Sequence, residues 1–317
     1  MPTQTAAPAW KTLLAFGIIY IVWGSTFLAI RVGVRDEPPL LLAGTRFVIA
    51  GLLLFGWMAA KREALPNRKQ WTSIALLALL IFVFDYGLLF WAERRVPSGV
   101  AAVVMATIPV FTAIAEITLL RTQKLTVRLA VALLIGLGGV AVLMSRSLGA
   151  LHVSGAPVDT LGALALLGGS VSWSIASVLN RKLVLPASKG VSAGAQMLLG
   201  GSMLSVLAVG SGELHGFHVG AVPRSAWLAL LYLIVAGSLI GFTAYVWLIH
   251  HQSPTKVGTY AYVNPVVAVV LGYFFASEPL GLRTVLGTLF VLVSVIVITT
   301  TRPKPVLVPG TVLEDAA

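Results

Sequence analysis

The residues with the clearest chemical meaning are charged side chains inside long apolar stretches. Arg46 lies in the second stretch and Asp85 in the third. Each is about 7 residues from the predicted outer end of its stretch, so a rise of 1.5 Å per residue places both roughly 10 Å below a membrane surface. An unpaired charge at that depth costs several kcal/mol, so pairing, neutralisation or a water-lined cavity is expected. Equal depth predicts an ion pair, which either is structural or gates and recognises a substrate.

Two glutamates are further candidates for gating or for coupling to an ion. Glu116 lies near the predicted inner end of the fourth stretch, close in depth to several basic residues. The favoured interpretation is an interfacial salt bridge, and proton coupling is the alternative. Glu278 lies in a predicted outer loop before the last stretch, where a cap or a gate is expected. Asp85 is the third candidate for coupling or gating.

Two prolines, Pro109 and Pro265, fall near the middle of the fourth and ninth stretches, 156 residues apart. Each removes one backbone donor and frees the carbonyl one turn earlier. One interpretation is a packing kink, because proline is common in membrane helices. The other is a pair of broken helices at a transport site, and the matched positions favour it. Thr107 and Asn264 beside them supply hydroxyl and amide groups for a ligand.

Aromatic and small polar side chains complete the candidate site. Trp23 and Trp173 are 150 residues apart, and small polar residues follow both. Singly, such residues are more often core or lipid-facing, but a set related by a repeat indicates a pocket with flat apolar faces and polar donors. The predicted substrate-binding residues are Trp23, Ser25, Thr26, Arg46, Asp85, Tyr86, Thr107, Trp173, Tyr245, Tyr260 and Asn264.

The elements that must position these residues are ten apolar stretches of roughly 20 residues each. Continuous runs of this length indicate helices, because the strands of a membrane barrel alternate in polarity over about 10 residues. The sequence therefore predicts an all-α, polytopic membrane protein with ten transmembrane helices. The predicted spans are 12–33, 38–60, 71–93, 97–120, 125–145, 159–180, 189–211, 225–250, 254–277 and 280–301.

The stretches form two sets of five with recurring residues. Gly44 and Gly51, for example, recur 150 residues later as Gly194 and Gly201. Because five is odd, the second set must cross the membrane in the opposite sense, which is the inverted-repeat plan of secondary transporters. The predicted units are a first five-helix repeat at 1–145, a linker at 146–158, an inverted five-helix repeat at 159–301 and a flexible cytoplasmic tail at 302–317.

Composition limits the partners and the compartment. With 58% hydrophobic and 10% charged residues, the chain cannot coat a soluble globule, so lipid is its main solvent. The net charge is +11, but the sequence has no basic stripe interleaved with aromatic residues, so nucleic-acid binding is not expected. With both termini cytoplasmic, 14 basic residues fall in inner loops and 7 in outer loops, which predicts that orientation. Without cysteines or buried histidine clusters, neither a metal nor a cofactor is expected.

Short motifs in both halves carry a family resemblance. They are VPSGVAAVVMATIPVF at 96–111, SPTKVGTYAYVNPVVAVVLG at 253–272, WGSTF at 23–27, RF at 46–47, SW at 172–173 and SEPL at 277–280. With these motifs the chain resembles EamA-type proteins of the drug/metabolite transporter superfamily, in particular the YedA-like branch of bacterial inner-membrane exporters. The resemblance implies ten helices in two inverted repeats, a central cavity between the halves, and efflux of small metabolites or drugs. The segment TQKL at 122–125 departs from the family pattern, which usually has a glutamate before the fifth span.

The leading hypothesis is a secondary transporter that exports small organic metabolites or drugs across a bacterial inner membrane by alternating access, with proton coupling left open. The expected pocket suits an amphipathic or amino-acid-like solute better than a phosphate ester, which needs several convergent cations. The alternative is a non-transporting interaction or lipid-handling protein. A membrane-embedded enzyme is a weaker hypothesis, because catalytic motifs such as HExxH or a nucleophile elbow are missing. The expected partners are a small-molecule substrate and membrane lipids, with monomer and homodimer both open.

Overall fold

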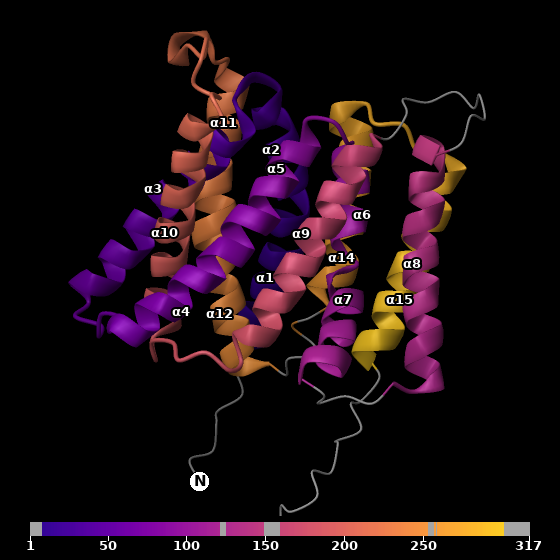
Figure 1. Cartoon of the computed structure of the whole chain (residues 1–317), viewed down its shortest axis with the longest axis horizontal. Helices are drawn as coiled ribbons and strands as arrows, with labels where there is room; N and C mark the ends of the chain where they lie inside the picture. Colours follow the sequence, from indigo (N-terminus) through magenta and orange to yellow (C-terminus); the bar gives the residue numbers. More distant parts are fainter. Residues whose placement is uncertain (1–7, 121–124, 149–158, 253–256, 258, 301–317) are drawn as a thin grey trace, which may run out of the picture.

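The computed structural model describes residues 8–120, 125–148, 159–252, 257 and 259–300. Within these residues every regular element is helical, as predicted. The apolar composition accounts for this, because a helix satisfies its own backbone hydrogen bonds inside lipid. The helices stand side by side, and the first and last helices have their free ends at the same side of the bundle, the lower side in Figure 1.

In the described part of the chain, seven helices are long and apolar enough to cross a membrane, and three further apolar helices are shorter. Their limits fall within about one helical turn of the predicted spans, except where the predicted ninth span begins outside the described residues. The seven long helices are Ala9–Asp36, Pro39–Ala60, Arg68–Glu93, Ser98–Leu119, Thr160–Leu179, Lys189–Gly210 and Arg224–Leu248, and the shorter three are Val127–Leu143, Tyr260–Ala276 and Thr284–Ile298.

Several long helices contain π-helical segments, whose turns are wider than those of an α-helix. Such turns are rare and often lie at functional sites. In chain order the elements are α1 Ala9–Gly17, π-helical η1 Ile18–Val22, α2 Trp23–Asp36, α3 Pro39–Ala60, α4 Arg68–Ala78, π-helical η2 Leu79–Gly87, α5 Leu88–Glu93, α6 Ser98–Met105, α7 Ile108–Ala115, π-helical η3 Glu116–Leu120, α8 Val127–Leu148, α9 Thr160–Leu179, α10 Lys189–Gly210, the 3₁₀ turn η4 Val219–Ala221, α11 Arg224–Tyr232, π-helical η5 Leu233–Ile240, α12 Gly241–His251, α14 Tyr260–Ala276 and α15 Leu282–Thr300.

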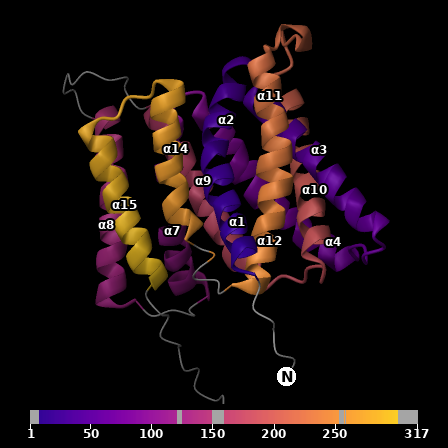
Figure 2. The ribbon, with the colours of Figure 1, turned by 180° about the vertical axis from the view of Figure 1, so that it is seen from behind.

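Glycines allow α3 and α10 to pack closely against each other (Figures 1 and 2). A methyl group on Gly51 would lie 2.7 Å from the Cα of Leu198, and one on Gly201 would lie 2.5 Å from the backbone nitrogen of Val48. These two contacts join matching positions 150 residues apart. Because backbone atoms cannot move aside, a larger residue at either glycine would force the helices apart.

The helices α8 and α15 form a second close pair, at the right-hand side of the bundle in Figure 1. A methyl group on Gly139 would lie 3.0 Å from the backbone oxygen of Gly287. A methyl group on Gly287 would likewise lie 3.0 Å from the backbone oxygen of Gly139. The Ser294 hydroxyl on α15 donates to the backbone oxygen of Ala132 on α8 at 2.6 Å. Small residues and an interhelical hydrogen bond thus hold this pair, as is common for helices in lipid.

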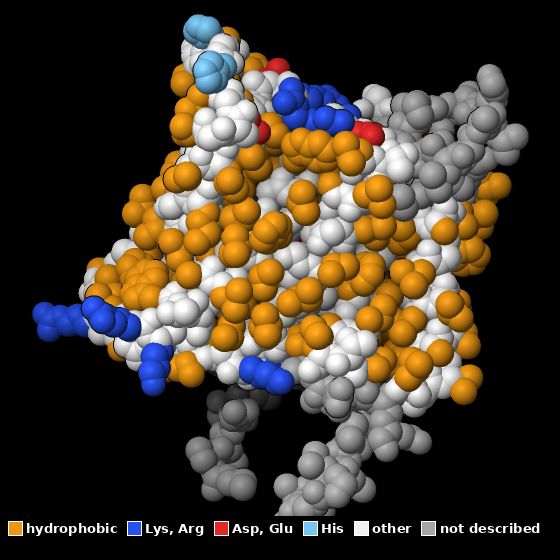
Figure 3. Space-filling model, viewed as in Figure 1, with side chains coloured by type: hydrophobic (Ala, Val, Ile, Leu, Met, Phe, Trp, Pro, Cys, Tyr) orange, Lys and Arg blue, Asp and Glu red, His pale blue; other side chains and the backbone are white. Residues whose placement is uncertain are grey.

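Apolar side chains cover the sides of the bundle, and charged side chains gather at its two ends (Figure 3). On the face shown, Lys and Arg lie at the lower end, whereas acidic side chains accompany the basic ones at the upper end. Val127 and Phe275 are 82% and 75% exposed, which would be unfavourable in water but suits contact with lipid chains. The charge pattern places the two membrane surfaces at the upper and lower ends of the bundle.

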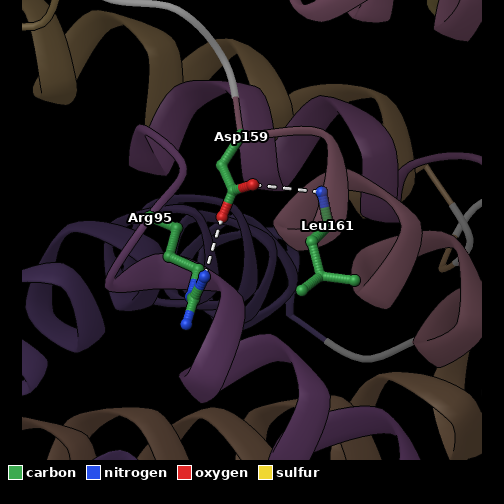
Figure 4. Close-up of polar contacts among 3 residues, drawn as sticks. All are labelled: Arg95, Asp159 and Leu161. Atoms are coloured by element: carbon green, nitrogen blue, oxygen red, sulfur yellow. Dashed lines mark hydrogen bonds and ion pairs between the residues drawn. The ribbon is translucent and has the colours of Figure 1, made fainter.

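An ion pair links the end of α5 to the start of α9 (Figure 4). The Nη1 of Arg95 lies 3.3 Å from the Oδ2 of Asp159. The other carboxylate oxygen of Asp159 accepts a hydrogen bond from the backbone nitrogen of Leu161 at 3.1 Å and thereby caps α9. The two charged side chains are 45% and 31% exposed, so the pair contributes only about 0.2–1 kcal/mol.

Candidate functional site

The guanidinium of Arg46, on α3, is enclosed by protein. The residue is 3% exposed, and its Nε donates to the hydroxyl of Ser238 on η5 at 3.1 Å. Its Cζ lies 4.7 Å from the ring centre of Phe47, 5.6 Å from that of Tyr86 and 5.9 Å from that of Phe90. Such contacts stabilise a desolvated cation by about 2 kcal/mol. We call these five residues the arginine cage.

One donor of the arginine cage is unused. The Nη1 of Arg46 is buried and donates to no protein group among the described residues. A guanidinium binds carboxylates through charge-assisted hydrogen bonds, so a carboxylate oxygen that reached this nitrogen would gain a strong partner. The surrounding rings add flat apolar faces.

Trp23, at the start of α2, belongs to a second aromatic group. Its Nε1 donates to the backbone oxygen of Gly237 on η5 at 3.1 Å. Its ring centre lies 5.4 Å from that of Tyr245 and 5.2 Å from that of Tyr260, and all three side chains keep part of their surface accessible. A methyl group on Gly241 would lie 2.9 Å from the indole Cδ1, so this glycine makes room for the ring. We call Trp23, Tyr245 and Tyr260 the tryptophan cluster.

The π-helical segment η5 joins the arginine cage to the tryptophan cluster. Gly237 binds Trp23 through its backbone oxygen, and the next residue, Ser238, binds Arg46. A methyl group on Gly237 would lie 3.2 Å from the Nη2 of Arg46 and 3.0 Å from the Cγ2 of Thr26. The two polar features of the site therefore depend on two consecutive residues of one wide helical turn.

The two hydroxyl residues that follow Trp23 are engaged inside the bundle. The Ser25 hydroxyl lies 2.6 Å from that of Tyr232 on α11 and donates to the backbone oxygen of Val22 at 2.9 Å. The Thr26 hydroxyl donates to the backbone oxygen of Trp23 at 2.6 Å. In this conformation both hydroxyls already have protein partners.

Trp173, on α9, adjoins the arginine cage and not the tryptophan cluster. Its ring centre lies 6.1 Å from that of Tyr86 in an edge-to-face arrangement. Both side chains are half-buried. The predicted aromatic residues thus divide into two groups, with Trp23 in one and Trp173 beside the other.

Asp85, on η2, does not form the predicted ion pair with Arg46. It is 1% exposed, and its Oδ1 accepts no hydrogen bond from the described residues. A methyl group on Gly169 of α9 would lie 3.2 Å from this oxygen, whereas Arg46 binds Ser238 on η5. Equal depth predicted the pair, but depth does not determine the direction in which a side chain leaves its helix.

The two matched prolines differ in their effect. The fourth long helix is interrupted before Pro109, where α6 ends at Met105 and α7 begins at Ile108. The hydroxyl of Thr107 lies in this interruption, is fully buried and donates to the backbone oxygen of Val104 at 2.6 Å. By contrast, α14 continues through Pro265, so the predicted break is absent there.

Asn264, next to Pro265, holds α14 against η1. With its amide nitrogen facing this segment, it donates to the backbone oxygens of Ile19, Tyr20 and Tyr260 at 3.2 Å each. Wide turns leave carbonyl groups poorly paired, and inside lipid such groups need other donors. Asn264 therefore supports the helix that carries Trp23.

The two glutamates predicted as gating or coupling residues have protein partners. Glu116 forms an interfacial salt bridge with Arg181, at 2.5 Å between Oε1 and Nη1. Glu278 accepts hydrogen bonds from the backbone nitrogen and hydroxyl of Ser98 at 2.7 and 2.8 Å, and from the backbone nitrogen of Gly99 at 3.0 Å. Glu278 therefore caps α6, where the helix dipole favours a negative charge.

Three glutamates at the ends of predicted spans were not singled out from the sequence; two of them, Glu37 and Glu93, are buried and Glu213 is half-buried. Glu93 is fully buried at the end of α5. Glu213 caps α3 by accepting from the backbone nitrogens of Leu40 and Leu41 at 3.0 Å each, although burial raises its pKa. Burial, with a smaller effect of Asp36, raises the pKa of Glu37 to about 6. Only contacts across the fold distinguish them from exposed acids.

An apolar groove lies on the side of the bundle, where α3, η2, α5 and α9 meet. Its volume is about 570 Å³. The residues that line it are Leu40, Val83, Phe84, Gly87, Leu88, Trp91, Leu161, Leu164 and Ala165. None of the predicted substrate-binding residues is among them, so the groove is separate from the arginine cage and faces lipid.

Similar proteins identify the family. The sequence matches the EamA-like transporter family twice, over residues 10–145 and 160–300. YedA of Escherichia coli strain K12, named as an uncharacterized inner membrane transporter, is 38% identical over 307 residues that cover 94% of each chain. The chain belongs to the EamA-like transporter family.

More distant proteins match over a similar extent. YvbV of Bacillus subtilis, named as an uncharacterized transporter, is 26% identical over 298 residues, which cover 92% of this EamA-like chain and 93% of YvbV. A solved protein structure with 21% identity covers 92% of this chain and 96% of its own, with a TM-score of 0.60. That likeness concerns the fold alone. This EamA-like protein is thus a multi-pass membrane protein of a transporter family.

Proposed function

We propose that this EamA-like protein is a secondary transporter that exports small organic solutes across a bacterial inner membrane. We propose further that the solute carries a carboxylate beside an aromatic or apolar group, as amino acids and many amphipathic metabolites do. The observation that supports this solute class is the unused, buried Nη1 of Arg46 in the arginine cage. A buried cation without a counter-charge is unfavourable, and a carboxylate on the ligand would supply that charge.

The proposed architecture is two inverted five-helix repeats, at 1–145 and 159–301, that work by alternating access. Support comes from the two separate family matches and from the matched contacts of Gly51 and Gly201 between α3 and α10. The excess of basic residues in one set of loops supports cytoplasmic termini. Since one chain holds both repeats, the proposed working unit is a monomer, with a homodimer as the alternative. Coupling of export to protons is part of the proposal.

A panel of matched ligands tests the solute class. Aromatic and aliphatic carboxylic acids, each beside its amide and the corresponding amine, are added to the purified protein, and the shift in Tm is measured. The acids should stabilise the protein and their amides and amines should not. Acids that stabilise the protein are then tested for counterflow in proteoliposomes, which distinguishes a transporter from a lipid-handling or interaction protein.

Arg46→Gln is the decisive variant in this assay. Loss of a hydrogen bond to a charged group costs about 1.5–3 kcal/mol, so affinity for the acids should fall roughly 10- to 100-fold. Gln196→Ala is the matched control, because Gln196 occupies the position 150 residues later and donates to Ser192 of its own helix at 2.9 Å. Equal stabilisation by acids and amides, or unchanged affinity in Arg46→Gln, would contradict the proposed solute class.

A further inference from the structure

Glu93 is, like Arg46, a buried ionisable residue with unpartnered side-chain atoms. It lies at the end of the long helix Arg68–Glu93, which also holds Asp85. Its side chain is fully buried, and neither carboxylate oxygen accepts a hydrogen bond from the described residues. At this end of the bundle Glu278 and Glu213 have donors because they cap helices, Glu37 has one buried oxygen without a donor, and Glu93 has two. Glu93 therefore needs an explanation that helix capping does not give.

Charged groups surround Glu93 without pairing with it. Arg31 on α2, Arg46 on α3 and Glu278 before α15 act on it electrostatically. No basic side chain among the described residues lies within 4.0 Å of its carboxylate oxygens. The Nη1 of Arg31 instead donates to the backbone oxygen of Glu93, and the Nε of Arg31 is buried without an acceptor.

An ionised carboxylate in this position would have lost its water and gained no donor. Desolvation then favours the neutral carboxyl group, because the charged form lacks the hydrogen bonds that would stabilise it. The described conformation thus suits a protonated Glu93.

We propose that Glu93 is a proton-binding site whose proton is exchanged with water during the transport cycle. In the described conformation a carboxyl oxygen of Glu93 holds the proton. When the helix ends separate and water enters, the O–H bond breaks, the proton passes to water, and the carboxylate pairs with the guanidinium of Arg31. Arg31 then exchanges the backbone oxygen for the carboxylate, so the change in protonation is coupled to the contact between α2 and α5.

Asp85 is a weaker candidate for the same role. It is also buried and its Oδ1 is unpartnered, but no cation is among the groups that act on it. Glu93 has a guanidinium in contact with it, because Arg31 donates to its backbone oxygen, whereas no guanidinium among the described residues donates to Asp85. The inference rests on the proposed transport function and names the coupling site within it.

Infrared spectroscopy tests the protonation of Glu93 without any substrate. The protein is studied in lipid bilayers at pH 8, where Glu37, with a pKa of about 6, is ionised. The wild type should show a deuterium-sensitive band of protonated carboxyl groups, Glu93→Gln should lose part of it, and the exposed control Glu63→Gln should lose none. A full band in Glu93→Gln, or no band in the wild type, would overturn the proposal. If Glu93→Gln does not fold, Asp85→Asn carries the test, and a residual band in it supports the proposal while its loss overturns it.

Transport measurements test the coupling. Proteoliposomes are loaded with labelled phenylalanine, or with another acid that shows counterflow in the ligand panel, and efflux is followed with and without a proton gradient. The gradient should accelerate efflux by the wild type and by Glu63→Gln, whereas Glu93→Gln should keep counterflow and lose the acceleration. Acceleration that persists in Glu93→Gln, or wild-type efflux that ignores the gradient, overturns the proton site and leaves the transport function intact. Absence of counterflow with every acid overturns the transport function, and the infrared result on Glu93 then stands separately.

Discussion

The two halves of the chain share their close helix packing but differ in their buried charges. Gly51 and Gly201, at matching positions, make equivalent backbone contacts between α3 and α10. Arg46 and Gln196 also match, yet Arg46 is enclosed by the arginine cage while Gln196 binds Ser192 one turn away on its own helix. The matched glycines thus keep the same packing contact in both halves, whereas the matched residues Arg46 and Gln196 have different surroundings.

Other matched positions show the same division. Arg31 is half-buried near Glu93, whereas Arg181, 150 residues later, is exposed and pairs with Glu116. Asp85 corresponds to Gly241, which makes room for the ring of Trp23. The first half therefore supplies the buried charges, and the second half places small residues beside them, such as Ser238 next to Arg46 and Gly169 next to Asp85. Packing is common to both halves, and the chemistry of the site is concentrated in one.

Substitution of the matched glycines tests the shared part of this comparison and should have the largest effect. Gly51→Val and Gly201→Val each force a side chain into backbone atoms, so each should lower the free energy of unfolding by about 1–3 kcal/mol or more. Thermal unfolding in detergent measures the loss. Gly56→Val is the control, because nothing lies within 4 Å of a methyl group there. A large loss at only one of the two glycines would show that the halves are not packed alike.

Substitution of the matched tryptophans tests the part that differs. Trp23→Phe removes the hydrogen bond to Gly237, worth about 0.5–1.5 kcal/mol, and disturbs the tryptophan cluster. Affinity for the carboxylic acids should fall roughly 2- to 10-fold. Trp173→Phe keeps an aromatic ring beside Tyr86 and should change affinity less. Equal effects in titrations of both variants would remove the distinction between the two aromatic groups.

Glu37 is a buried acid of the first half, and the matching position in the second half holds Ala187. The pH dependence of stability tests this difference between the halves. The folded-state pKa of Glu37, about 6, exceeds the ordinary value of 4.5, so the folded protein binds this proton more tightly than the unfolded chain does. Stability from this group is fully present below pH 4.5 and is lost as the pH rises to about 6. Glu37→Gln should therefore raise the Tm at pH 8 relative to the wild type, and not at pH 4. A difference in Tm that is the same at both pH values would contradict this assignment.

The ion pair between Arg95 and Asp159 should have the smallest effect. Both side chains are partly exposed, so a double-mutant cycle with Arg95→Gln and Asp159→Asn should give a coupling below about 1 kcal/mol. Asp159→Asn keeps an N-cap oxygen for α9, which separates the ion pair from the cap. A larger coupling would make this contact a principal connection between the first and second halves.

The helices could be predicted closely from the sequence, but the arrangement of the site could not. Apolar runs located the spans because lipid requires continuous helices of sufficient length. The same reasoning placed Arg46 and Asp85 at equal depth and could not give the directions of their side chains. The π-helical turns of η1 and η5 have no recognised sequence signal, yet they orient Trp23 and Ser238. The partners of Glu278 and Glu213 are distant in sequence, so only the folded chain reveals them.

The two glutamate caps also affect the order in which the chain can be completed during synthesis. The start of α3 is capped by Glu213, 173 residues after Leu40, and the start of α6 by Glu278, 180 residues after Ser98. Until the ribosome has added these acids, the first backbone N–H groups of both helices lack their final acceptors. A nascent chain that ends after α8, the fifth span of the first half, therefore presents two uncapped helix starts, those of α3 and α6. Its first half reaches its finished form only when the second half has been made.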